Sequence, residues 1–243
     1  MIEPTIQAKW KKLMMVNYPV DPQILKPYLP YDTELALWNN RSYVSLVGFL
    51  FLDVKLGGIS VPLHTNFVEI NLRFYVRRNY KGEWRYGVVF LKEIVALPMV
   101  TFIANTFVNE HYETMIVRHK LSKNQNGIFL NYKWKKKEWN SIEINCYPEL
   151  KEIAKGSQEH FFTAQHWGYT KLKDDKSREY SVEHPDWKIY DTKDYKINVD
   201  YGKVFGKEFA FLDDQHPESV FLAEGSEIIM RKGETISGKK NTF

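Results

Sequence analysis

The sequence predicts a mainly β protein with few short helices, arranged as a barrel or a large sandwich. Most of the chain alternates apolar and polar residues with a period of two, and it is rich in Val, Ile, Phe, Tyr and Trp. Pairs of turn-forming residues at 39–40, 57–58, 81–82, 124–127 and 174–175 divide this pattern into separate stretches. Many strands with few helical signals disfavour alternating βαβ units. Strands are expected at 10–17, 42–54, 67–78, 83–94, 112–121, 127–136, 141–147, 161–172, 178–184 and 220–231.

Helical signals occur in four short places. Asp21 and Pro22 are a capping residue and a first-turn proline, and Pro30 follows the end of that helix. Pro98 begins a second helix, and Gly156 ends a third. The helices are expected at 21–30, 98–109, 149–155 and 200–205.

The chain shows no internal repeat, no low-complexity linker and no break in composition. Its 243 residues are enough to bury one large core. We therefore expect a single domain at 1–232, followed by a loose polar tail at 233–243.

Composition indicates a soluble globular protein, with 44% hydrophobic and 26% charged residues. The longest apolar run, 44–54, has the length of a strand and is interrupted by Asp53, so we expect no membrane association. The N-terminal residues lack the uninterrupted apolar stretch of a signal peptide. A single cysteine, Cys146, excludes an internal disulfide, and a cytoplasmic location is expected.

Charge does not indicate a nucleic-acid partner, because 34 basic residues are nearly balanced by 30 acidic ones. The local exception is KWKKKEW at 133–139. It would suit either a platform for phosphates and stacked bases or an exposed hairpin whose Trp134 and Trp139 pack inward. Isolated charge runs are usually solvated, so no nucleic acid is expected.

Motifs for metals and cofactors are absent from the sequence. The seven histidines have no HExxH spacing, and no phosphate-binding or dinucleotide-binding glycine motif follows a strand. We therefore expect no metal and no cofactor.

The stretch NFVEINLRFYVRR at 66–78 carries the strongest functional signal. One face of this strand is apolar, and the other carries Glu69, Asn71, Arg73 and Tyr75. Glu69 and Arg73 are about 13 Å apart along the strand, so a ligand could contact both. The polar face is either ordinary wet surface or the wall of a cavity. The aromatic residues Phe67 and Tyr75 are poorly suited to water and favour the cavity.

A second candidate wall is EHFFTAQHWGYT at 159–170, where Trp167 and Tyr169 share one strand face and His160 lies on the other. Aromatic packing with hydrogen-bonded histidines explains any single residue of this stretch best. The alternative is a second polar wall of the same pocket. His184 precedes a proline, which holds it extended, and it could close the pocket.

Five segments of the chain resemble a known family: 7–17, 66–76, 166–170, 182–187 and 208–212. They resemble the YqjF-like family, a bacterial family of unknown function in the acetoacetate decarboxylase-like superfamily. The resemblance covers about residues 5–232, nearly the whole chain. It implies a closed antiparallel β-barrel or cone with a central cavity and a few peripheral helices.

Acetoacetate decarboxylase uses a lysine that forms a Schiff base, and an adjacent lysine lowers its pKa. The resemblance places Tyr112 and Glu113 at these two positions, and it places Glu69 where the decarboxylase keeps a functional glutamate. A phenol has no amine to condense with a carbonyl, and the nearest lysines are Lys92 and Lys120. The resemblance therefore implies a retained cavity without Schiff-base decarboxylation.

Two main functions remain open, besides a third, an interaction module that would use the basic segment 133–139. The first is an enzyme that binds a small carboxylate- or carbonyl-bearing molecule and performs non-covalent acid/base chemistry, as a lyase, hydratase or isomerase does. The second is a non-catalytic binding protein for an aromatic or lipid-like metabolite. The partner is a small molecule in both, and a homodimer is compatible with uncovered strand edges. The expected catalytic residues are Glu69, Tyr112 and His160, and the expected binding residues are Asn71, Arg73, Tyr75, Trp167, Tyr169 and His184.

Overall fold

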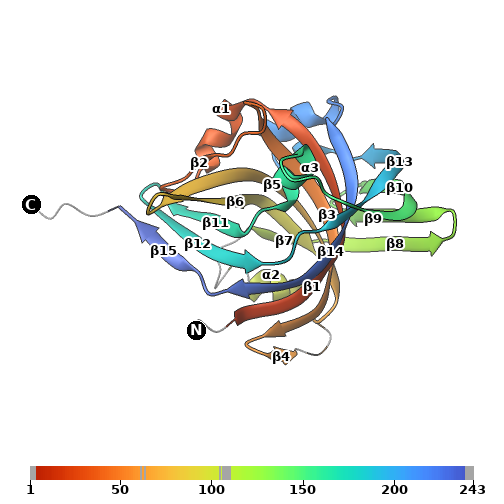
Figure 1. The fold of residues 1–243 in the computed structure, drawn as a ribbon, viewed down its shortest axis with the longest axis horizontal. Helices are drawn as coiled ribbons and strands as arrows, with labels where there is room; N and C mark the ends of the chain where they lie inside the picture. The colour runs from red at the N-terminus through yellow and green to blue at the C-terminus, as the bar shows by residue number, and fades with distance from the viewer. Residues whose placement is uncertain (1–3, 61, 63, 104, 106–110, 239–243) are drawn as a thin grey trace, which may run out of the picture.

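The computed structural model describes residues 4–60, 62, 64–103, 105 and 111–238. Strands dominate it, and the few helices are short (Figure 1). The strands are β1 Pro4–Val20, β2 Glu34–Leu35, β3 Ser42–Leu56, β4 Ile59–Ser60, β5 Phe67–Tyr80, β6 Glu83–Val95, β7 Tyr112–Thr114, β8 Ile116–Asn124, β9 Gly127–Lys135, β10 Trp139–Glu152, β11 Trp167–Lys173, β12 Lys176–Glu183, β13 Lys188–Asn198, β14 Ser219–Arg231 and β15 Glu234–Ser237. The α-helices are α1 Pro22–Leu25, α2 Pro98–Ile103, α3 Gln158–Thr163 and α4 Tyr201–Val204, and 3-10 turns cover Lys26–Tyr28 and Lys207–Asp213.

The central strands close into a barrel-like ring in the order β1, β3, β5, β6, β11, β12 and β14. The ring closes at β12, which pairs with β11 on one side and with β14 on the other, where Val182 lies opposite Met230. One junction is parallel: Trp167 of β11 lies opposite Gly87 of β6. The mainly β, barrel-like class predicted from the sequence is confirmed.

The sheet continues beyond the ring from β14 through β13, β10, β9 and β8. In Figure 1 the β8–β9 hairpin extends away from the ring. The apolar face of β9 and β10 covers the outer side of β5. The Tyr132 ring packs directly against Gly48 of β3, so closely that a Cβ atom at position 48 would lie only 2.7 Å from the ring. The core-facing residues of β5, which include Ile70 and Leu72, are therefore fully buried.

A second core lies inside the ring. Phe162 of α3 is fully buried there and contacts the rings of Tyr43 and Tyr75 at centroid distances of 5.3 Å. Apolar side chains from β1, β3 and β14 complete this core. Strand β5 is thus buried on both faces, which places its polar side chains inside the molecule.

Two of the expected helices are confirmed by their caps. The Asp21 side chain accepts a hydrogen bond from the Gln23 N–H at the start of α1, and Asp200 accepts one from Lys203 N–H at the start of α4. Helix α2 begins at Pro98 as expected, whereas most of 104–109 lies outside the described residues.

The expected helix at 149–155 is wrong throughout: Glu149–Glu152 continues strand β10, and 153–155 is not helical. Leu150 lies opposite Tyr190 of β13 in that pairing. Sheet pairing has overridden local propensity here. The sequence did not predict the partner strand β13, because its side chains are mostly polar and partly exposed.

The expected strand at 161–172 is also wrong in its first part. Ser157 caps helix α3 by accepting a hydrogen bond from the His160 N–H, and β11 begins only at Trp167. The expected strand at 112–121 is divided into β7 and β8 by Met115.

The segment 233–243, expected to be loose, contains β15, which pairs with β12 from Lys176 opposite Ser237 to Glu179 opposite Glu234. Its first residues therefore belong to the sheet. The single-domain assignment stays a prediction. Among the described helices, none has the length and apolar character needed to cross a bilayer.

Candidate functional site

The ring encloses a cavity of about 180 Å³. Residues from β1, β3, β5, β6, β11, β12 and β14 line it, together with Met99 and Val100 of α2. Most of these side chains are apolar or aromatic. The lining residues with ionisable or amide side chains are His64, Glu69, Asn71, Arg73, Glu93, Tyr112, Gln165 and Tyr180.

The polar face of β5 forms one wall of this cavity. Glu69, Asn71 and Arg73 are only 2%, 1% and 6% exposed, because β3 and β6 flank the strand and α3 packs inside the ring. The face predicted to be either wet surface or cavity wall is therefore cavity wall.

Glu69 is held by two neutral donors. Its Oε1 accepts a hydrogen bond from Asn71 Nδ2 at 3.0 Å, and its Oε2 accepts one from the Tyr112 hydroxyl at 3.0 Å. Burial raises the pKa of Glu69 to about 7, while these two hydrogen bonds and the charge of Arg73 oppose the rise. Near neutral pH this carboxyl group is poised to give or take a proton.

Backbone and side-chain contacts position Tyr112. Its strand β7 pairs in parallel with β6, and Tyr112 lies opposite Glu93. The Asn105 side chain brackets the Tyr112 backbone: its Nδ2 donates to Tyr112 O at 2.9 Å and its Oδ1 accepts from Tyr112 N–H at 2.8 Å. These contacts hold the phenol in reach of Glu69.

Glu113, the residue after Tyr112, interacts with lysines and not with Glu69. Glu113 forms ion pairs with Lys92 and Lys136, and they lower the pKa of Glu113 against the effect of its burial. Lys92 Nζ also donates to Val204 O at 2.6 Å. Among the described residues that line the cavity, none is a lysine.

Arg73 is a buried cation whose contacts are neutral. Its Nη2 donates to Phe162 O at 3.2 Å, and its guanidinium lies 5.7 Å from the centre of the Tyr75 ring. Within the described part of the chain, no ion pair joins Arg73 to a carboxylate, and its buried Nε has no hydrogen-bond partner. An unpaired buried guanidinium is energetically costly, so an anion bound beside Arg73 would be held by a favourable charge–charge interaction.

Glu93 and Gln165 are among the polar cavity residues that had not been predicted. Glu93 is 2% exposed and lies opposite Asn71 on β6. The sequence signal was a pair of adjacent charges, Lys92 and Glu93, inside the otherwise apolar stretch 88–97, and it does not show which of the two faces inward. Gln165 reaches the cavity because α3 turns the chain inward before β11, and no sequence pattern indicated that turn.

Trp167, Tyr75 and Tyr169 occupy different surroundings. Trp167 lines the cavity, and its ring also covers the Arg85 guanidinium at 4.1 Å. The Tyr75 hydroxyl hydrogen-bonds to Ser45 Oγ at 2.6 Å, and the Tyr169 hydroxyl donates to Arg85 O at 3.4 Å. Tyr75 and Tyr169 are buried in the two cores and are not among the lining residues.

The two predicted histidines lie elsewhere. His160 is part of α3, and His184 is stacked between His166 and Trp187 at centroid distances of 4.5 Å. Burial lowers the pKa of His184, and its ring faces a separate surface pocket beside Lys9. The structure therefore brings together Glu69, Asn71, Arg73, Tyr112 and Trp167, and it does not bring Tyr75, His160, Tyr169 or His184 to the cavity.

In the part of the chain that the structure describes, His, Cys, Asp and Glu form no group of three or more that could hold a metal ion.

The protein has the acetoacetate decarboxylase-like fold, in which a barrel-like β ring surrounds a buried cavity. The chain superposes on acetoacetate decarboxylase from Legionella pneumophila with a TM-score of 0.64 and 10% identity, covering 96% of this chain and 87% of that one. The enduracididine biosynthesis enzyme MppR, complexed with the condensation product of pyruvate and imidazole 4-carboxaldehyde, gives a TM-score of 0.63 at 11% identity, covering 96% and 90%. An acetoacetate decarboxylase-like enzyme from Sphingomonas wittichii RW1 gives 0.57 at 10% identity, covering 98% and 92%.

The sequence assigns the chain to a specific family within this fold. Residues 7–227 match the DUF2071 family, described as an uncharacterized conserved protein, and the chain belongs to this family. It is 25% identical over 187 residues to the uncharacterized protein YqjF of Bacillus subtilis (strain 168), covering 74% of this chain and 73% of that protein.

Proposed function

We propose that the protein binds a small organic molecule with a carboxylate or carbonyl group in the ring cavity and moves a proton on it without a covalent intermediate. The observation that carries the proposal is Glu69, a buried carboxyl group hydrogen-bonded to the Tyr112 phenol, with its pKa raised to about 7 by burial. A general base is most effective when its pKa lies near the working pH.

The proposed reaction is proton transfer next to a carbonyl. Ionised Glu69 takes a proton from the carbon beside the carbonyl group, and the electron pair of that C–H bond moves to form an enolate. The Tyr112 hydroxyl, which lies beside Glu69, stabilises the negative oxygen by hydrogen bonding. Glu69 then returns the proton to carbon or to oxygen, so no oxidant or other reactant is needed.

Arg73 and Asn71 are the proposed binding groups. Arg73 offers an uncompensated guanidinium to a carboxylate, and its buried Nε has a free donor within the described residues. Asn71 Oδ1 is also buried without a hydrogen-bond partner there, while the Nδ2 of the same amide holds Glu69. Buried polar atoms without a partner are rare, and a bound ligand or a water would satisfy them.

Schiff-base chemistry is not part of the proposal. Tyr112 has no amine, and Lys92 is bound to Glu113 and to a backbone carbonyl. Borohydride reduction in the presence of acetoacetate should therefore leave the mass of the protein unchanged. A mass increase that corresponds to a reduced adduct would contradict this part of the proposal.

A second candidate is a non-catalytic binding protein for an aromatic or lipid-like metabolite. It is favoured by the predominance of apolar and aromatic side chains in the cavity wall. The two candidates share the ligand site and differ in whether a proton is exchanged.

Exchange of hydrogen for deuterium distinguishes them. Pyruvate, acetoacetate and phenylpyruvate would each be incubated with the protein in D2O, and the loss of the C–H signal beside the carbonyl would be followed by proton NMR. The proposal expects faster exchange with at least one acid and its loss in Glu69→Gln. Binding of an acid without any faster exchange would overturn the catalytic proposal in favour of the second candidate.

A further inference from the structure

A second buried carboxyl group, that of Glu93, faces the cavity beside Glu69. Glu93 lies on β6, lines the cavity and is 2% exposed, as Glu69 is. In the antiparallel pairing of β5 with β6, Glu93 lies opposite Asn71, so Glu69 is its diagonal neighbour on the same face. The Cβ atoms of diagonal neighbours in such a pair are about 7 Å apart. The two carboxyl groups therefore share one space from which water is largely excluded.

The charges in this space would not balance if both carboxyl groups were ionised. Among the described residues that line the cavity, the other charged or titratable side chains are Arg73 of β5, Tyr112 of β7, Tyr180 of β12 and His64, which precedes β5. The phenols are neutral near pH 7, since an ordinary tyrosine pKa is about 10. His64 is only partly buried, and its Nδ1 lies 2.9 Å from Pro62 O. Arg73 can compensate one carboxylate, and a second negative charge in a buried site is disfavoured.

The lysine next to Glu93 in the sequence does not change this balance. The Lys92 ammonium forms an ion pair with Glu113 and donates a hydrogen bond to Val204 O. Strands β1, β3 and β14 and helix α2 contribute apolar or aromatic side chains to the described cavity wall. We therefore expect Glu69 and Glu93 to keep one proton between them near neutral pH.

Glu93 is also the neighbour of Tyr112. Strand β7 pairs in parallel with β6, and Tyr112 lies directly opposite Glu93. The Tyr112 phenol, which hydrogen-bonds to Glu69, is the group proposed above to stabilise the negative oxygen of the substrate. A proton carried by Glu93 would therefore lie near that oxygen, whereas Glu69 serves the carbon.

Buried polar atoms mark the space around the two carboxyl groups as a place for a bound molecule. Asn71 Oδ1 and Arg73 Nε have no hydrogen-bond partner among the described residues, and their side chains are almost fully buried. Asn71 connects the two carboxyl residues, because it donates to Glu69 and lies opposite Glu93. Buried polar atoms are normally satisfied, so a substrate or a water is expected there. Two carboxyl groups that contact one bound molecule can serve it as acid and base.

From this geometry we infer that Glu69 and Glu93 act as a pair that holds one proton, with Glu69 as the base at carbon and Glu93 as the acid at oxygen. The inference rests on the proposed function and adds a residue to its mechanism. Ionised Glu69 takes the proton from the carbon beside the carbonyl group, and the electron pair of that C–H bond forms a carbon–carbon double bond. The π electrons of the carbonyl group take the proton of Glu93, which gives an enol. The reverse steps return both protons.

This division of roles keeps the buried charge constant. The pair carries one proton before the transfer, on Glu93, and one proton after it, on Glu69. Arg73 therefore faces a single negative charge throughout, and no step creates an uncompensated charge in the cavity. The reaction needs no oxidant, reductant or further reactant.

Carboxyl titration tests the pair without any substrate. The full chain, labelled with carbon-13 at the side-chain carboxyl carbon of glutamate, would be followed by NMR from about pH 4 to 10, and Glu69→Gln would assign the Glu69 signal. Coupled groups lose their protons in two steps that belong to the pair. We therefore expect the Glu69 signal to change in two steps in the wild type and in one step in Glu93→Gln. Glu83→Gln, at the exposed start of the same strand, is the matched control and should keep both steps.

The pH dependence of proton exchange tests the role of Glu93. Pyruvate, acetoacetate and phenylpyruvate in D2O serve as probes, as they do for the proposed function. The rate should rise with pH as Glu69 loses its proton and fall at higher pH as Glu93 loses its own, which gives a bell-shaped profile. Glu93→Gln should lower the maximal rate at least about a hundredfold and remove the fall at high pH. Glu93→Asp, which restores a carboxyl group, should recover part of the rate and the fall.

The outcomes separate this inference from the function on which it rests. A one-step Glu69 titration that is the same in the wild type and in Glu93→Gln would overturn the inference, whatever the exchange rates are. A bell-shaped profile that persists in Glu93→Gln would also overturn it, while the proposed function stands. If none of the three acids exchanges with the wild type, the proposed function fails, and the role of Glu93 as the acid fails with it. Thermal unfolding of each variant confirms that it is folded, and loss of the second titration step together with the high-pH fall supports the inference.

Discussion

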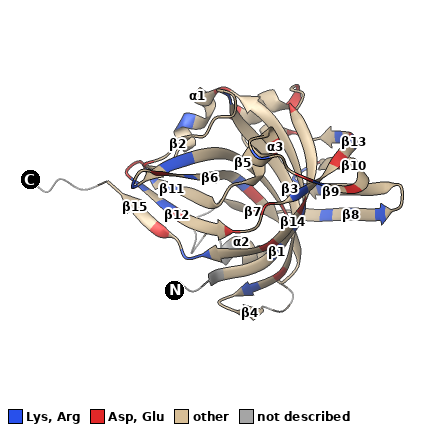
Figure 2. Cartoon of the chain, in the orientation of Figure 1, with Lys and Arg blue, Asp and Glu red and all other residues tan. Residues whose placement is uncertain are grey.

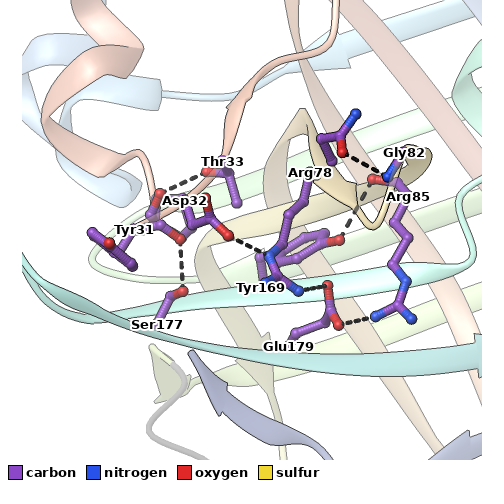
Figure 3. A network of polar contacts seen from close by, with 11 residues as sticks. Tyr31, Asp32, Thr33, Arg78, Gly82, Arg85, Tyr169, Ser177 and Glu179 are labelled. Carbon is purple, nitrogen blue, oxygen red and sulfur yellow. Dashed lines mark hydrogen bonds and ion pairs between the residues drawn. The ribbon is translucent and has the colours of Figure 1, made fainter. Parts of the chain in front are cut away.

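Two buried carboxylates, Glu69 and Glu179, lie on the ring in opposite chemical surroundings. They are 2% and 5% exposed, so both have lost nearly all contact with water. Within the described part of the chain, the hydrogen-bond donors to Glu69 are the Asn71 amide and the Tyr112 phenol. Glu179 lies between two arginines, as Figure 3 shows.

The Glu179 network is balanced by charge and held by packing. Arg78 donates to Glu179 at 3.2 Å and to Asp32 at 2.8 Å, while Arg85 binds the other carboxylate oxygen. The Arg85 guanidinium is sandwiched between the rings of Tyr80 and Trp167 at 3.7 Å and 4.1 Å. These contacts join β5, β6, β11 and β12, which indicates a role in fixing the ring.

The difference shows what separates a structural carboxylate from a reactive one. Opposite charges offset the desolvation of Glu179, and the group stays committed to its partners. Among the described residues no ion pair joins a cation to Glu69, and the charge of Arg73 offsets its desolvation only in part, so its protonation remains adjustable near neutral pH. Lys and Arg, blue in Figure 2, are spread over many strands of the fold, so this contrast reflects local placement and not the overall charge.

The largest expected effect tests the reactive side of the comparison. Glu69→Gln keeps the shape but cannot accept a proton, so proton exchange on a bound 2-oxo acid should fall by about two to four orders of magnitude. At about pH 8 its free energy of unfolding should not decrease, because a neutral amide does not suffer the desolvation of a carboxylate. Proton NMR measures the exchange and urea denaturation measures the stability. An unchanged exchange rate would show that Glu69 is not the base.

The structural side of the comparison predicts the opposite response. Glu179→Gln leaves Arg78 and Arg85 without their shared carboxylate and should lower the free energy of unfolding by about 3 kcal/mol, the lower end for broken buried ion pairs, because both arginines are partly exposed. Urea denaturation at neutral pH measures it. Equal stability of Glu179→Gln and Glu69→Gln would show that the two carboxylates do not differ in their contribution to stability.

The sequence predicted the reactive wall well, for a physical reason. A strand has period two, so alternation alone placed Glu69, Asn71 and Arg73 on one face opposite Ile70 and Leu72. Aromatic neighbours on the polar face then favoured a cavity over water. The predicted strands likewise followed from periodicity, which is local information.

The rest depended on contacts between distant segments. His160 was assigned to a strand, but the Ser157 cap folds that stretch into α3, which changes the direction of every following side chain. Strand β13 was overlooked because its pairing with β10 and β14 determines its conformation more than its polar sequence does. Glu93 reaches the cavity through its register with Asn71, which the sequence of β6 does not contain.

The pH dependence of stability gives a smaller effect with a definite sign. The pKa of Glu69 is raised from 4.5 to about 7 on folding, so the folded protein binds more protons than the unfolded chain between these values. The stability contribution of Glu69 is fully present below about pH 4.5 and is lost as the pH rises through about 7, with a total of about 3 kcal/mol as an upper value. Comparing wild type with Glu69→Gln by urea denaturation from about pH 5 to 8 isolates this contribution. Parallel curves for the two proteins would contradict the raised pKa.

The smallest expected effect concerns the position of Tyr112. Asn105→Ala removes two hydrogen bonds to the Tyr112 backbone, which lie at an exposed site. Exposed neutral hydrogen bonds contribute about 1 kcal/mol or less to stability, so unfolding should change little, whereas a displaced phenol should slow proton exchange about tenfold. Asn105→Asp keeps the acceptor for Tyr112 N–H and should retain more of the exchange rate than Asn105→Ala. A higher exchange rate in Asn105→Asp than in Asn105→Ala would show that Asn105 acts by positioning Tyr112, because Glu69 keeps its burial and its Asn71 contact in both variants.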